Sequence, residues 1–78
     1  MPITDQERKL VADRLRAMLE KLPEAERDLP FMRVLVKGEQ VSLSAAQMLL
    51  EVLQGTEIGD EIVEMEMRKL GYYEQLKG

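Results

Sequence analysis

Three amphipathic segments, each bounded by helix start and stop signals, constrain the fold of this chain more than any other feature. The segments cover residues 5–22, 45–54 and 57–70. Their apolar residues recur every three or four positions, which is the spacing of one face of an α-helix. Because each helix is apolar along one face only, the three faces must be buried against one another. The sequence therefore predicts a mainly α fold, a small bundle of three to four helices.

The first segment has the clearest boundaries. Thr4-Asp5-Gln6-Glu7 has the pattern of a capping box, in which the Thr4 hydroxyl accepts from the Glu7 amide and the Glu7 carboxylate reaches back. Pro23 ends the helix near Leu22, because the residue before a proline disfavours helical geometry. Pro23 can itself open a short connector that contains one helical turn.

The second and third segments meet at a glycine. A second capping box begins at Ser44, and Gly55 stands where a left-handed C-terminal cap is expected. Thr56 or Asp60 then caps the last helix, and Gly71 is the expected stop. We therefore expect two helices joined by a tight corner.

The segment between the first two helices fits two structures. The apolar residues of FMRVLVKG, residues 31–38, can form one side of a short helix. They also alternate with basic residues and include Val34 and Val36, whose β-branched side chains favour a strand. Since a lone two-stranded hairpin is marginally stable, we favour the helix. The alternative is a short β-hairpin at about 31–43.

The core predicted from these faces is small, as expected for one domain that covers residues 1–78 with a flexible tail at 72–78. There is no Cys for a disulfide, and no His or Cys for the usual zinc sites. A homodimer or a partner protein is the remaining way to supplement so thin a core. The residues expected to form the core are Leu10, Leu15, Leu19, Leu49, Leu53, Ile62 and Met67.

The charge is uneven along the chain. The net charge is −4, and residues 45–78 carry seven acids and three bases. Nucleic acids and membrane surfaces are negative, so we expect neither as a partner. The start of the chain lacks the pattern of a signal peptide, and no apolar run approaches the roughly 20 residues of a membrane helix. We expect a cytoplasmic protein.

A helix-turn-helix that reads DNA is the main alternative function. The turn Gln54-Gly55-Thr56 has a suitable length, and a dimeric regulator could use it. The candidate recognition helix is strongly acidic, however, and phosphates would repel its carboxylates. Five cations of the first helix lie among acids that can pair with them. The acids of the candidate recognition helix are Glu57, Asp60, Glu61, Glu64 and Glu66.

No residue set points to catalysis. Without His a Ser-His-Asp triad cannot form, and the few Ser and Thr residues occupy positions typical of helix caps. There is no phosphate-cradling glycine pattern and no calcium-loop pattern. We therefore expect no enzyme, no small-molecule substrate, no cofactor and no metal. A small enzyme subunit or metal carrier is the third alternative.

Methionines and tyrosines give the strongest functional signal. Flexible thioethers on a surface suit adaptable partner binding, and Tyr is enriched at interfaces. We therefore predict a small acidic adaptor, inhibitor or assembly factor that binds a partner or itself through an apolar helix face. Met18, Met32 and Met48 are interpreted as core filler. The predicted partner-binding residues are Ile58, Ile62, Met65, Met67, Tyr72 and Tyr73.

Overall fold

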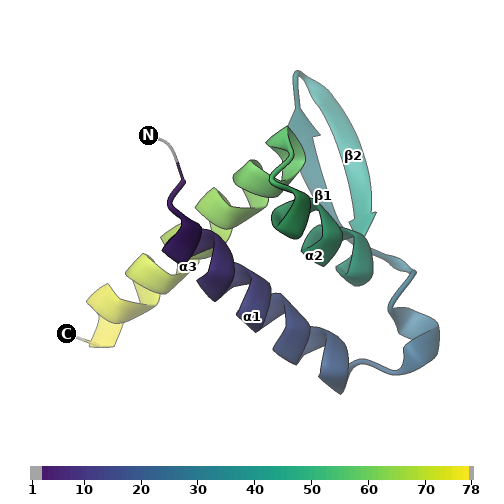
Figure 1. Cartoon of the computed structure of the whole chain (residues 1–78), viewed down its shortest axis with the longest axis horizontal. Coiled ribbons are helices and arrows are strands. Elements are labelled where there is room, and N and C mark those ends of the chain that lie inside the picture. Colours follow the sequence, from purple (N-terminus) through teal and green to yellow (C-terminus); the bar gives the residue numbers. More distant parts are fainter. Residues whose placement is uncertain (1–2, 78) are drawn as a thin grey trace.

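Three α-helices, a short 3₁₀ turn and one antiparallel hairpin make up the described part of the chain. The computed structural model describes residues 3–77, with side chains described through residue 71. Figure 1 shows α1 crossing in front of α3, with the hairpin beside α2 and the first turns of α3. The elements are α1 (Asp5–Lys21), the 3₁₀ turn η1 (Glu24–Glu26), β1 (Pro30–Val36), β2 (Glu39–Ser44), α2 (Ala45–Gln54) and α3 (Glu57–Lys77).

The helix starts follow the sequence signals. Thr4 caps α1 as predicted: its hydroxyl accepts from the Glu7 amide at 3.1 Å, and the Glu7 carboxylate accepts from the Thr4 amide at 3.2 Å. Ser44 caps α2 by accepting from the Gln47 amide at 3.0 Å. Thr56 caps α3, because its hydroxyl accepts from the Gly59 amide at 3.1 Å. Local hydrogen bonding therefore fixes where each helix begins.

The last helix is longer than predicted. It continues through Gly71 to Lys77 rather than ending at residue 70. A glycine inside a helix costs about 1 kcal/mol relative to alanine, which weakens a helix without breaking it. The prediction of a flexible tail at 72–78 stays a prediction, because the side chains of 72–77 and the whole of Gly78 lie outside the described part.

The helix favoured for the segment near 31–38 was wrong, and the alternative hairpin is correct. Strand β1 pairs antiparallel with β2, with Val34 opposite Val41 and Met32 opposite Leu43. The turn between them places Lys37 and Gly38 at positive φ, the backbone geometry of a tight hairpin turn. The hairpin is stable because the helices cover one of its faces, and Val34 and Leu43 are buried there with the helical core.

The core forms where the three helices and the hairpin meet. Leu15 and Ile62 are buried as predicted. The prediction was wrong for Leu10 and Leu53, which are 45% and 49% exposed. Leu19, Leu49 and Met67 are only partly buried. The full buried apolar set is Val11, Ala12, Leu15, Val34, Leu43, Ala45, Met48, Val52, Ile62 and Val63.

On α1 and α2 the buried face differs from the predicted face by one residue. Val11 is buried in place of Leu10, and Val52 in place of Leu53. One residue turns a helix by about 100°, so neighbouring apolar positions compete for the inward direction. Helix α2 packs against α1, α3 and both strands. These neighbours determine that Val52 rather than Leu53 faces the core, and the apolar spacing within α2 does not specify them.

Candidate functional site

The predicted partner-binding side of α3 faces the core. Ile62 has no exposed surface, and Ile58, Met65 and Met67 are partly buried against the core cluster. The side chains of Tyr72 and Tyr73 lie outside the described part of the chain. Helix α2, together with α1 and β1, packs against α3 and covers much of this apolar side.

The other side of α3 is acidic where it begins. Glu57 and Glu61 are exposed, and the Lys37 ammonium lies 3.7 Å from the Glu57 carboxylate. Glu64 pairs with Arg68 at 3.6 Å, one turn further along the same helix. A helix that entered a DNA groove by this end would bring these carboxylates toward phosphates, at an electrostatic cost. The electrostatic repulsion that argues against DNA binding through α3 therefore applies to the folded structure as well.

The junction of α2 and α3 is closely packed; we call residues 51–60 the corner. Gly55 has φ of +70° and ends α2 with its amide 3.1 Å from the Glu51 carbonyl oxygen. Gly59 lies so close to α2 that a Cβ built on it would stand 2.0 Å from the same oxygen. The Thr56 hydroxyl also contacts the Glu51 carboxylate. Only glycine fits at Gly59 without a shift of the backbone.

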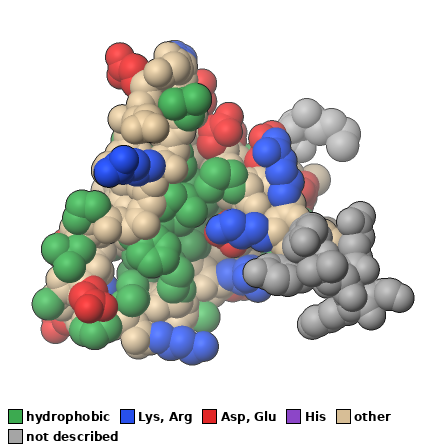
Figure 2. Space-filling view, turned by 180° about the vertical axis from the view of Figure 1, so that it is seen from behind, with side chains coloured by type: hydrophobic (Ala, Val, Ile, Leu, Met, Phe, Trp, Pro, Cys, Tyr) green, Lys and Arg blue, Asp and Glu red, His purple; other side chains and the backbone are tan. Residues whose placement is uncertain are grey.

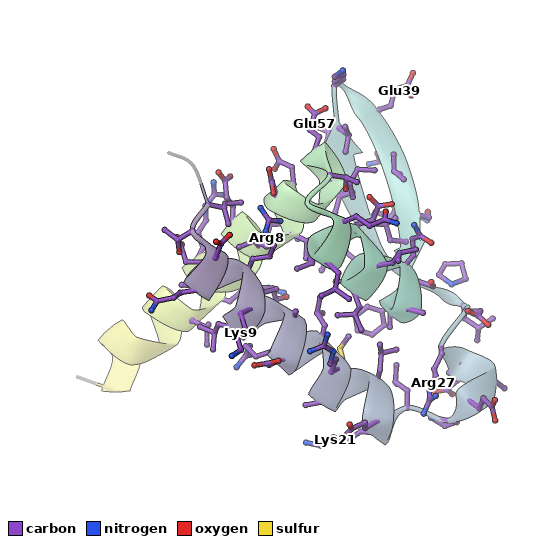
Figure 3. All side chains as sticks on the ribbon, in the orientation of Figure 1. Arg8, Lys9, Lys21, Arg27, Glu39 and Glu57 are labelled. Atoms are coloured by element: carbon purple, nitrogen blue, oxygen red, sulfur yellow. The ribbon has the colours of Figure 1, made fainter. Side chains whose placement is uncertain are left out.

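Arg8 connects α1 to the corner. Its guanidinium donates at 3.1 Å to the Val52 carbonyl oxygen near the end of α2, an oxygen that also accepts from the Gly55 amide at 3.3 Å. It also lies 3.0 Å from an Asp60 carboxylate oxygen, although the two groups are not aligned as a hydrogen bond. Figure 3 shows Arg8 between the beginning of α1 and the corner. We interpret these contacts as structural, since they join three helices.

An open groove of about 440 Å³ lies at the other end of α1, and we call it the methionine groove. It runs between the second half of α1, the beginning of β1 and the middle of α3, with Met48 of α2 at its floor. Seen from behind, hydrophobic side chains gather from the middle of the molecule toward one side, with Lys and Arg side chains around them (Figure 2). The groove is lined by Arg14, Leu15, Ala17, Met18, Lys21, Phe31, Met32, Met48, Glu66 and Lys69.

Phe31 gives the groove an exposed aromatic wall. It is 52% exposed, and the strand register shifts between Pro30 and Met32, so Phe31 has no partner across the hairpin. Leu35 is even more exposed, at 63%, but it does not line the groove. The two residues lie on the same strand and provide a matched pair, one inside the candidate site and one outside it.

The methionines lie in and around the core, and three of them line the groove. Met48, interpreted from the sequence as core filler, is buried in the core cluster and forms the floor of the groove. Met18, Met32, Met65 and Met67 are all partly buried against that cluster, and of these four only Met18 and Met32 line the groove. Because thioether side chains repack readily, three of them around one groove suit a surface that adapts to what it binds.

Sequence reasoning missed the groove because no single segment forms it. It appears only when β1 and α3 pack beside α1, and β1 was expected to be helical. One signal was present: Arg14, Met18 and Lys21 are four and three residues apart, which places them on one side of α1. These three residues place a thioether between two cations on one side of the helix. The core prediction instead used the leucines that recur at helical spacing.

A metal site has no support in the described part of the chain. Within residues 3–71, no three acidic side chains lie together in a way that could hold a metal ion. The groove itself has one carboxylate, Glu66, and no neutral polar side chain among its lining residues. Its chemistry is apolar contact and charge.

None of the helices in the described part is both long enough and apolar enough to cross a membrane.

Comparisons with known proteins add no functional information. No family model, no curated protein and no solved structure matches the chain. The groove, its charges and the packing described above are therefore the features that point to a function.

Proposed function

We propose that this chain is a non-enzymatic protein-interaction module, a small acidic adaptor, inhibitor or assembly factor that binds another protein. The observation that carries the proposal is the methionine groove, an open apolar depression of about 440 Å³ between elements that are far apart in the sequence. The proposed contact surface is this groove, in place of the α3 face predicted from the sequence. Its aromatic and thioether walls are typical of surfaces that bind proteins.

Burial on α3 supports the choice of the groove. Ile62 is already enclosed by the chain's own core, so a partner could reach it only if the fold opened. Phe31 and Met18 need no such change, because both already line an open surface. Association that leaves the backbone unchanged is the commoner behaviour of preformed interfaces.

A comparison of variants in a capture experiment tests the proposal. The tagged chain is crosslinked in lysate of its source cell, and bound proteins are identified by mass spectrometry. A double variant, Phe31→Gln with Met18→Gln, should lose a protein that the wild type captures. The matched control Leu35→Gln, on the same strand but outside the groove, should keep it.

Three results would contradict the proposal. Equal capture by the groove variant and the wild type would remove the groove as the contact. Binding to duplex DNA at low salt that weakens steeply as salt rises would favour the regulator instead. A dimer in sedimentation of the wild type at micromolar concentration, together with a monomer for Phe31→Gln, would identify the partner as a second copy of the chain.

A further inference from the structure

We infer that the occupant of the methionine groove is an acidic amphipathic helix of another protein. This inference rests on the proposed function and names the chemistry of its partner. Two observations carry it: the charges at the edge of the groove, and the apolar character of its floor.

The edge of the groove is basic, although the chain as a whole is acidic. Three cations, Arg14, Lys21 and Lys69, line it together with a single carboxylate, Glu66. Glu66 is largely buried and lies 3.4 Å from the Lys69 ammonium, so this pair is nearly neutral. Among the described residues no ion pair involves Arg14 or Lys21.

This local positive charge dominates at short range. The net charge of the chain is −4, but charges are screened beyond about 8 Å at physiological salt. A segment seated in the groove therefore interacts mainly with Arg14 and Lys21 rather than with the acidic side of α3. Carboxylates on the flanks of such a segment would meet these cations, and the complementary charges would orient it.

The floor of the groove favours a stripe of side chains over a small polar ligand. Met48 and Leu15 are almost fully buried at its base, and Met18, Met32 and Phe31 form its walls. Sites for small molecules place a few polar groups inside the cavity to orient the ligand, and this lining has its charges only on long, flexible side chains. A helix that inserts apolar side chains from one face requires only apolar walls and complementary edges.

A pair of designed peptides tests the inference. Each has about 14 residues, a common length for a short helix, with the same Leu and Met residues along one face. One peptide carries Glu on both flanks of that face, and the other carries Lys. Fluorescence anisotropy measures the binding of each labelled peptide to the full chain.

We expect the Glu-flanked peptide to bind about tenfold more tightly, since each exposed charge contact contributes a factor of roughly two to five. Arg14→Glu with Lys21→Glu should reverse the preference. The control is Arg16→Glu with Lys9→Glu, which makes the same change in net charge on the same helix without touching the groove. Figure 3 labels Lys9 near the beginning of α1 and Lys21 at its end. The control should keep the preference.

The alternative outcomes overturn the inference in distinguishable ways. If both peptides bind equally, or the Lys-flanked peptide binds more tightly, the partner is not acidic. If Phe31→Gln then abolishes the binding of both peptides, that result still supports the proposed function. If neither peptide binds while decanoate binds in a manner that requires Phe31, the groove holds a small amphiphile. If nothing binds, the helical occupant is excluded, and the capture experiment decides the proposed function separately.

Discussion

The corner and the methionine groove lie toward opposite ends of α1 and differ in how closely their atoms are packed. At the corner, backbone approaches backbone, and Gly59 leaves no room for even one methyl group beside Glu51. At the groove, side chains alone line an open space of about 440 Å³. One end of the molecule fixes the arrangement of the helices, and the other leaves apolar surface uncovered.

The difference separates residues that the fold requires from residues that it tolerates. The corner uses hydrogen bonds to backbone groups, which depend on position to within a few tenths of an ångström. The groove uses thioethers and the exposed ring of Phe31, which accept many arrangements. We therefore expect substitutions at the corner to change stability and substitutions at the groove to change binding.

The largest effect should come from Gly59→Ala. The new Cβ would collide with the Glu51 carbonyl oxygen, and the backbones of α2 and α3 would have to separate. We expect a loss of about 3 kcal/mol in the free energy of unfolding, the upper part of the usual range for overpacking. Urea denaturation followed by circular dichroism measures the loss.

Gly71→Ala is the matched control on the same helix. A Cβ at Gly71 meets nothing within 4 Å, so the substitution should stabilise the chain by about 0.5–1 kcal/mol. Equal effects at the two glycines would contradict the close approach of α2 and α3.

Arg8→Met should have the next largest effect. It removes the hydrogen bond to the Val52 carbonyl and the charge beside Asp60. Because the pair is partly exposed, we expect a loss of about 1–2 kcal/mol in unfolding free energy. Arg16→Met, which breaks only an exposed pair with Asp13, should cost a few tenths of a kcal/mol at most. A similar cost for both would show that Arg8 does not join the helices.

Thr56→Ala should cost about 1 kcal/mol, since it removes the N-cap of α3 and the contact with Glu51. Thr4→Ala removes the cap of α1 at an exposed end and should cost about half as much. Thermal melting of the two variants side by side measures the difference. A larger loss at Thr4 would mean that the beginning of α1 contributes more to stability than the corner does.

Phe31→Gln should have the smallest effect on stability. Phe31 is half exposed and lies outside the buried core, so we expect a change within about 0.5 kcal/mol, as for most surface substitutions. Leu35→Gln should be equally mild. Chemical denaturation of both variants is also the folding control for the binding experiments, and a loss above about 2 kcal/mol at Phe31 would make its role structural.

Local signals predicted most of the fold. The caps at Thr4, Ser44 and Thr56 and the left-handed Gly55 are each set by residues within four positions, and the structure places helix boundaries beside them. The hairpin was harder, because residues 31–38 satisfy both a helical and an alternating pattern. Packing against the helices decides between the two patterns, and a single segment does not contain that information.

The candidate site was beyond local reasoning for the same reason. Met18, Met32 and Met48 come from α1, β1 and α2, and nothing in their own segments brings them together. The apolar residues of α3 were predicted to exceed what the core could bury, whereas α2, α1 and β1 all pack against this helix. Spacing alone places Arg14, Met18 and Lys21 on one side of α1. That this side lines a groove depends on the packing of β1 and α3 beside it.

The central claim is that the methionine groove, and not the apolar side of α3, is the docking surface. Methyl NMR of methionine-labelled chain tests it most directly, with resonances assigned by single Met→Leu variants and the Glu-flanked peptide as titrant. The account predicts that the methyl signals of Met18, Met32 and Met48 shift, while those of Met65 and Met67 stay in place. Shifts at Met65 and Met67 with Met18 and Met32 unchanged would contradict it.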